Sequence, residues 1–163
     1  MNKVQLALKD QIVDTVKNIK KHNIGEILNW ILRNQIAKYS LANDFYYSTQ
    51  FTLDQAKSMK LDITKRSIKI KKNKITYEHP VPSKVVFNLI MAAKNESEIL
   101  NILEETDCIV ILSHSEDQKL RDRGLISSMP KGWSYGDNIF ARYEKANIEV
   151  LPKRIKMTGA IRR

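Results

Sequence analysis

The chain has 163 residues, of which 42% are hydrophobic and 28% charged, a composition that fits one folded domain and argues against a wholly disordered chain. No stretch approaches the about eighteen apolar residues that a membrane-spanning helix needs, and the single Cys108 excludes an internal disulfide and a CxxC zinc site. We therefore expect a cytoplasmic protein with no membrane partner.

Basic residues outnumber acidic ones and give a formal net charge of +10 at pH 7. Such a surplus favours a polyanionic partner, most often DNA or RNA, although solubility alone also accounts for a basic surface. The positive charge is clustered along the chain as well as large, and we therefore expect a nucleic-acid partner.

The first part of the chain is expected to be mainly helical. Apolar residues recur at close to helical spacing over residues 3–20 and again over 24–39. Acidic residues within the first of these helices argue against a signal peptide. The aromatic and polar stretch 39–51 predicts a loop, and a short helix is expected over residues 52–60.

Basic residues crowd the segment 60–74, in which Asp62 is the only acid. Isoleucines along it favour a strand over 67–70 and a second strand over 74–79, with the sequence KKNK as the hairpin turn. A helix over 64–70 is the alternative for the first of these strands.

Helices and one clear strand alternate after Pro82. The patterns predict helices over residues 83–95 and 97–105, and the β-rich run DCIVILS predicts a strand that ends at His114. A helix is expected over 116–122, followed by a turn-rich segment. A last short helix, DNIFARYEKANI, precedes a basic C-terminal stretch.

These elements predict an α+β fold, with N-terminal helices and a small β-hairpin or ββα-like core that is interrupted by helices. We expect a single α+β domain over residues 1–152, in which 1–59 is mainly helical and 60–152 holds the ββα-like core. Residues 153–163 form a basic C-terminal tail in this prediction.

Two predicted strand ends carry the side chains that are best suited to catalysis or metal binding. The first strand delivers Glu78 and His79 and is stopped by Pro80. The second passes from Ser113 through His114 directly into a helix start, where free backbone amides and the helix dipole favour anions and the ligands of metal ions. This helix carries Glu116, Asp117, Arg121 and Arg123.

The stretches TYEHPVP and CIVILSHSEDQKL, taken together, resemble the ββα core of the His-Me finger nucleases, the HNH group. In that family a histidine ends the first strand, often after an acidic residue and before a hydrophobic residue and proline. The second strand then leads into a helix that bears a metal-binding residue. The resemblance covers residues 74–123 of this chain.

The resemblance implies a metal-dependent phosphodiesterase with His79 as the general base. A neutral imidazole can take a proton from water as the water attacks phosphorus. Glu78 would orient the imidazole or bind the metal, and Arg121 or Arg123 would offset the developing negative charge.

The same resemblance implies a divalent cation held by Glu116, Asp117 and His114. The cation would polarise the phosphate and stabilise the leaving oxygen. Oxygen ligands favour Mg²⁺ or Mn²⁺ over zinc.

Each of these residues also has an ordinary structural explanation. His79 can simply end a strand, with Glu78 paired to a nearby basic residue, and His114 can flank a helix. Acids at positions such as Glu116 and Asp117 are favoured by the helix dipole alone. Both explanations stay open at this point.

The candidate nucleic-acid contacts are basic residues of the segment 60–74, of the last helix and of the C-terminal tail, where lysine and arginine would release counterions from a phosphate backbone. These residues are Lys65, Arg66, Lys69, Lys71, Lys72, Lys74, Arg142, Lys153 and Arg154.

The sequence thus supports two main interpretations. The first is a small metal-dependent endonuclease of the HNH kind. The second is a basic protein without catalysis that binds nucleic acid or serves as an accessory protein, as is common in phages and mobile elements. A third interpretation is a protein-interaction role in which the helices over residues 3–39 form a homo-oligomer interface.

Overall fold

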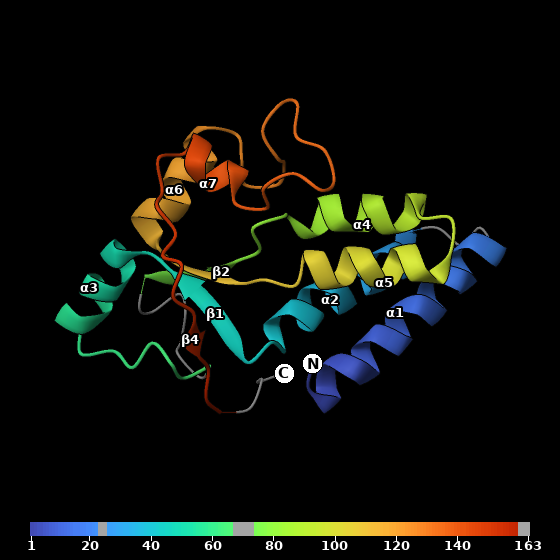
Figure 1. Ribbon diagram of the computed structural model, residues 1–163, viewed down its shortest axis with the longest axis horizontal. Coiled ribbons are helices and arrows are strands. Elements are labelled where there is room, and N and C mark those ends of the chain that lie inside the picture. The colour runs from blue at the N-terminus through green and yellow to red at the C-terminus, as the bar shows by residue number, and fades with distance from the viewer. Residues whose placement is uncertain (23–25, 67–73, 160–163) are drawn as a thin grey trace.

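The computed structural model describes residues 1–22, 26–66 and 74–159, and it has the α+β fold that the sequence predicts (Figure 1). The elements follow in the order α1 (Lys3–His22), α2 (Glu26–Leu41), β1 (Phe45–Ser48), α3 (Gln50–Ser58), β2 (Ile75–Glu78), α4 (Ser83–Ala92), α5 (Glu96–Glu105), β3 (Val110–Ser113), α6 (His114–Asp122), α7 (Ala141–Lys145) and β4 (Ile155–Lys156).

The four strands form one mixed sheet in the order β2-β3-β1-β4. β2 pairs antiparallel with β3, so that Ile75 lies opposite Ser113 and Glu78 lies opposite Val110. β1 pairs parallel with β3, with Tyr47 opposite Val110. β4 pairs antiparallel with β1 and forms an edge of the sheet.

The strand β3 lies at the centre of the packing because all of its residues are buried. Alternate side chains of a strand point to opposite faces of the sheet. Val110 and Leu112 accordingly join the core that α6 and α7 cover, whereas Ile109 and Ile111 join a second core on the other face. This explains why DCIVILS is nearly continuously apolar.

A separate helical layer extends from one end of the sheet. Figure 1 shows α1, α2, α4 and α5 side by side on the right, and α3, α6 and α7 around the sheet on the left. The helical layer has its own core, which includes Ile12, Leu32, Ile90 and Leu103. This core forms because each helix carries a periodic stripe of apolar residues on one face.

Two of the four strands lie where the sequence predicts none. β1 lies within the stretch 39–51, which was expected to be a loop, and β4 lies within the expected basic tail. Both strands are short, and each is stabilised by distant partners instead of by its own pattern. Tyr46 in β1 and Met157 next to β4 are buried in the same core.

Several boundaries also differ from the prediction. α3 begins at Gln50, with the Thr49 side chain accepting a hydrogen bond from the Thr52 amide. α6 begins at His114, and α7 is limited to Ala141–Lys145. The predicted strand over 67–70 and most of its hairpin turn lie outside the described residues.

A buried carboxylate joins the helical layer to the sheet. Asp107 lies between α5 and β3, and its Oδ2 accepts hydrogen bonds from Gln5 Nε2 at 2.7 Å and from Asn43 Nδ2 at 2.8 Å. Its Oδ1 is buried and has no hydrogen-bond partner within the described ranges. Burial therefore raises the pKa of Asp107 to about 6, although the two hydrogen bonds oppose the rise.

We predict that Asp107→Asn raises the free energy of unfolding above pH 6 and that this gain shrinks as the pH falls. A carboxyl group whose pKa is raised in the folded state contributes stability at low pH, and the contribution is lost as the pH rises through about 6. The gain is at most about 3 kcal/mol. Urea unfolding of both proteins across this pH range measures it.

The matched control is Asp14→Asn, since Asp14 is exposed on α1. Surface substitutions of this kind change stability by at most about 0.5 kcal/mol. A variant Asp107→Asn that is less stable than the wild type at every pH would contradict the prediction.

Candidate functional site

The pairing direction of β2 and β3 separates the two strand ends in which the sequence concentrates its polar residues. Because these strands are antiparallel, Glu78 at the end of β2 lies beside the beginning of β3. Ser113 at the end of β3 lies beside the beginning of β2. Glu78 and His79 therefore lie at one end of the sheet, and His114 lies at the other.

Arg142 of α7 is the partner of the first strand end. Its side chain is 0% exposed, and its Nη2 donates to Glu78 Oε2 at 2.7 Å and to the His79 carbonyl at 2.6 Å. Its Nη1 donates to the carbonyls of Leu125 and Ile126. One guanidinium thus holds β2, α7 and the loop after α6 together, and a buried cation is tolerated only with such partners.

The carboxylate of Glu78 is largely removed from water in this arrangement. Burial raises the pKa of Glu78, and the neighbouring Arg142 guanidinium opposes the rise. The charges of Asp117 and Arg121 also act on it, which places these two α6 residues near the Glu78–Arg142 pair. Because α6 follows β3 and packs on both β2 and β3, its middle lies nearer to Glu78 than its first residue does.

Asp117 and Arg121 form an ion pair of their own, with Arg121 Nε 2.9 Å from Asp117 Oδ2. Asp117 is buried, and its Oδ1 lacks a hydrogen-bond partner among the residues that the structure describes. Arg123 is exposed at the C-terminal end of α6. Of the four predicted catalytic residues, Glu78 and Arg121 are therefore brought near each other, and Arg123 ends the helix at the surface.

The imidazole of His79 points to the helical layer. Its Nε2 lies 3.4 Å from the carbonyl oxygen of Ala37 in α2. Burial lowers the pKa of His79 to about 4, and the Arg142 charge adds to this effect. The ring is neutral at pH 7, and a proton on Nε2 would be donated to Ala37.

Glu116 links two helices at the other end of the sheet. Its Oε2 accepts hydrogen bonds from the Ser113 amide at 3.0 Å, from Ser113 Oγ at 2.7 Å and from Thr52 Oγ1 at 2.6 Å. The Ser113 hydroxyl in turn accepts from the Glu116 amide, which completes a capping box at the start of α6. The S-x-x-E spacing of this capping box is present in the sequence. It could have indicated that Glu116 caps the helix, but we predicted a metal ligand instead.

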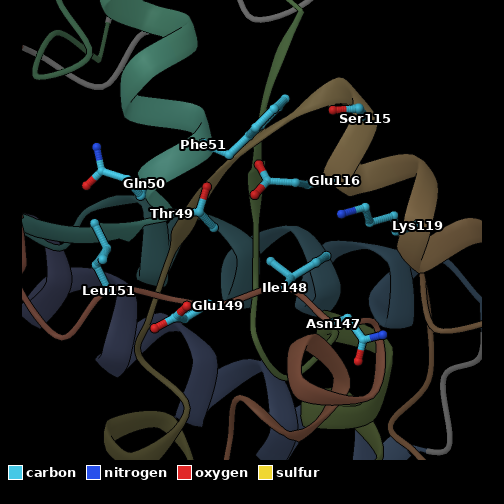
Figure 2. Close-up of a pocket in the computed structure, with 10 residues that line it drawn as sticks. All are labelled: Thr49, Gln50, Phe51, Ser115, Glu116, Lys119, Asn147, Ile148, Glu149 and Leu151. Atoms are coloured by element: carbon cyan, nitrogen blue, oxygen red, sulfur yellow. The ribbon is translucent and has the colours of Figure 1, made fainter.

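A pocket opens where the two parallel strands end. β1 and β3 run directly into α3 and α6, so that both helix starts meet at the same edge of the sheet, the place where ligands bind in many α/β folds. The cavity has a volume of about 620 Å³, and Figure 2 shows Thr49 and Glu116 pointing toward one another across it. It is lined by Thr49, Gln50, Phe51, Ser115, Glu116, Lys119, Asn147, Ile148, Glu149 and Leu151.

Two of the three predicted metal ligands already have hydrogen-bond or ion-pair partners. Glu116 Oε2 already accepts three hydrogen bonds, and Asp117 Oδ2 is bound by Arg121. His114 is exposed on the first turn of α6. Within residues 1–22, 26–66 and 74–159, no group of three or more His, Cys, Asp or Glu side chains is placed to hold a metal ion.

The predicted nucleic-acid residues fall into different environments. Lys74, Lys153 and Arg154 are exposed, whereas Arg142 is fully buried and offers nothing to a phosphate. Lys65 pairs with Asp62, and Arg66 pairs with Asp44. Lys69, Lys71 and Lys72 lie outside the described residues.

An exposed basic and aromatic surface lies along the edge strand β4. Phe45 is opposite Lys156 in the β1–β4 pair, and residues opposite each other point to the same face of a sheet. The Arg154 guanidinium lies over the Phe45 ring, 5.3 Å from its centroid. We call Phe45, Lys153, Arg154 and Lys156 the β4 surface; Phe45 and Lys156 were not among the predicted site residues.

The chain matches no protein-family model, no curated protein and no solved structure in the comparisons made. No helix of the described part is long and apolar enough to cross a membrane.

We predict that Arg142→Ala lowers the free energy of unfolding by about 3–5 kcal/mol, because the change leaves the Glu78 carboxylate buried without its cation. It also removes the hydrogen-bond donor of three backbone carbonyls. Urea unfolding measures the loss. The control is Arg123→Ala at the exposed end of α6, and a loss no larger than the control's would contradict the role assigned to Arg142.

We predict that the His79 ring titrates with a midpoint at about 4 in an NMR titration. A histidine whose pKa is lowered in the folded state contributes stability above its ordinary value of 6.5, and this contribution is lost as the pH falls toward about 4. The stability advantage of the wild type over His79→Gln should therefore narrow across that window. A midpoint near 6.5 would show that the ring is not buried as described.

Proposed function

We propose that the protein binds nucleic acid through the β4 surface and that Glu78 and His79 serve the fold. The observation that carries the proposal is the set of exposed cations in and just before β4, Lys153, Arg154 and Lys156, beside the exposed ring of Phe45. Lysine and arginine along a strand edge can follow a phosphate backbone, and each contact releases condensed counterions.

The charge distribution around this surface supports the proposal. From Leu151 to the end of the chain the sequence contains no acidic residue. Lys65, whose backbone bridges to Thr158, brings a further basic residue next to β4. The nearby acids Asp44 and Asp62 are each paired with a cation, Arg66 and Lys65, so a polyanion meets a net positive field here.

Catalysis at His79 receives less support from the geometry. The predicted base faces the Ala37 carbonyl in the helical layer, and the Glu78 carboxylate is engaged by Arg142. His114 and Glu116 lie at the opposite end of the sheet from Glu78. The HNH-like nuclease, with its Mg²⁺ or Mn²⁺, stays a prediction on the strength of the sequence resemblance.

We predict that Lys153→Gln/Lys156→Gln weakens binding to short labelled DNA and RNA oligonucleotides and makes the binding less dependent on salt. Each phosphate contact that is lost reduces the slope of log Kd against log salt by about 0.7–0.9. Two lost contacts should therefore reduce it by about 1.5. Fluorescence anisotropy at several salt concentrations measures both quantities.

The matched control is Lys21→Gln/Lys94→Gln, which removes the same charge from the end of α1 and from the turn between α4 and α5. Equal weakening by both pairs would show that net charge alone determines binding. Incubation of the bound oligonucleotides with Mg²⁺, Mn²⁺ or EDTA tests the nuclease prediction in the same samples. Metal-dependent cutting that His79→Gln abolishes would overturn the assignment of His79 to the fold.

A further inference from the structure

We infer that the nucleic acid recognised by this edge of the sheet is single-stranded, with bases stacked on Phe45 and Phe51. This inference rests on the proposed function and adds that the bound nucleic acid is single-stranded and not a duplex. It is carried by two exposed rings, one at each end of the segment 151–157, and by the pocket beside the second ring.

The first ring is Phe45. It is 41% exposed although it belongs to a strand whose next residue, Tyr46, is almost completely buried. Arg154 lies over the ring and Lys156 lies opposite it. An aromatic ring with cations beside it is the usual platform for an unpaired base, because the base stacks while its phosphate meets the cations.

The second ring is Phe51, in the first turn of α3. It is 57% exposed and lines the pocket at the carboxyl ends of β1 and β3. Figure 2 shows it on the same cavity as Gln50 and Ser115. Amide and hydroxyl groups of this kind donate and accept hydrogen bonds, as the edge of a base requires.

The segment 151–157, which contains β4, connects these two places. The Leu151 amide donates to the Ser48 carbonyl at 2.9 Å, and the Met157 amide donates to the Asp44 carbonyl at 2.8 Å. Residues 151–157 therefore run beside β1 from the pocket, which Leu151 lines, to the Phe45 end. Lys153, Arg154 and Lys156 lie between the two rings along this path.

The pocket is large enough for part of a nucleotide. Its volume of about 620 Å³ lies within the range of about 300–1,000 Å³ that is common for small-molecule sites. A base can enter such a pocket only if it is unpaired and unstacked, because the bases of a duplex face one another inside the helix. The charged residues of the lining are Glu116, Glu149 and Lys119, a net negative set that favours an uncharged base over a phosphate.

The test compares single-stranded and duplex oligonucleotides of the same length, DNA and RNA, for the wild type, Phe45→Ala and Phe51→Ala. We expect the wild type to prefer the single strands. Each substitution should weaken single-strand binding by at least about fivefold, the effect of losing one stacked base. Duplex binding and the salt slope should stay unchanged, because no cation is removed.

The matched control is Trp30→Ala, since Trp30 is a 67% exposed aromatic residue on α2. Circular dichroism melting confirms that each variant is folded. Equal affinity for single strands and duplexes, or an unchanged affinity of both phenylalanine variants, would overturn this inference and leave the proposed function standing. Failure of the wild type to bind any oligonucleotide would overturn both.

Discussion

The antiparallel pairing of β2 with β3 is the constraint on which the positions of the polar residues depend. It places Glu78 beside Val110 and Ser113 beside Ile75, so the two polar strand ends face opposite ends of the sheet. Each end then forms its own network. At one end Arg142 donates hydrogen bonds to Glu78 and to backbone carbonyls. At the other end Glu116 of α6 accepts a hydrogen bond from Thr52 of α3. The parallel pair β1–β3 adds the pocket at that second end.

A buried ion pair such as Glu78–Arg142 is better suited to holding structural elements together than to catalysis. The Arg142 guanidinium satisfies one carboxylate and three carbonyls at once, and the cost of burying it is offset only while all of them are in place. Glu78 cannot accept a proton from a substrate without losing part of this compensation. The same geometry turns the neutral His79 ring to the helical layer. Both residues are thus explained by the packing that they complete.

The sequence predicts the elements with strong local patterns and misses those that depend on distant partners. The helices over 3–20 and 83–95 and the strand DCIVILS follow from periodicity and from apolar runs, and all are present. β1 and β4 are short, and their burial comes from pairing with each other and with β3. Pairing direction is likewise not encoded in any one segment. The sequence could therefore single out the polar residues of both strand ends, but whether they meet in one site depends on a strand pairing that local patterns do not contain.

The β4 edge of the sheet is basic and has an aromatic ring beside it. Edge strands commonly carry lysine because charge prevents pairing with the edge of another sheet, and this explanation alone accounts for Lys153 and Lys156. It does not account for Phe45, which lies on β1 beside the edge strand and whose exposed ring promotes the association that the lysines prevent. A ring that is retained there beside Arg154 is better explained by a flat ligand that covers it. The exposed ring of Phe45, more than the positive charge, therefore favours a ligand-binding role for this edge over a role limited to preventing sheet association.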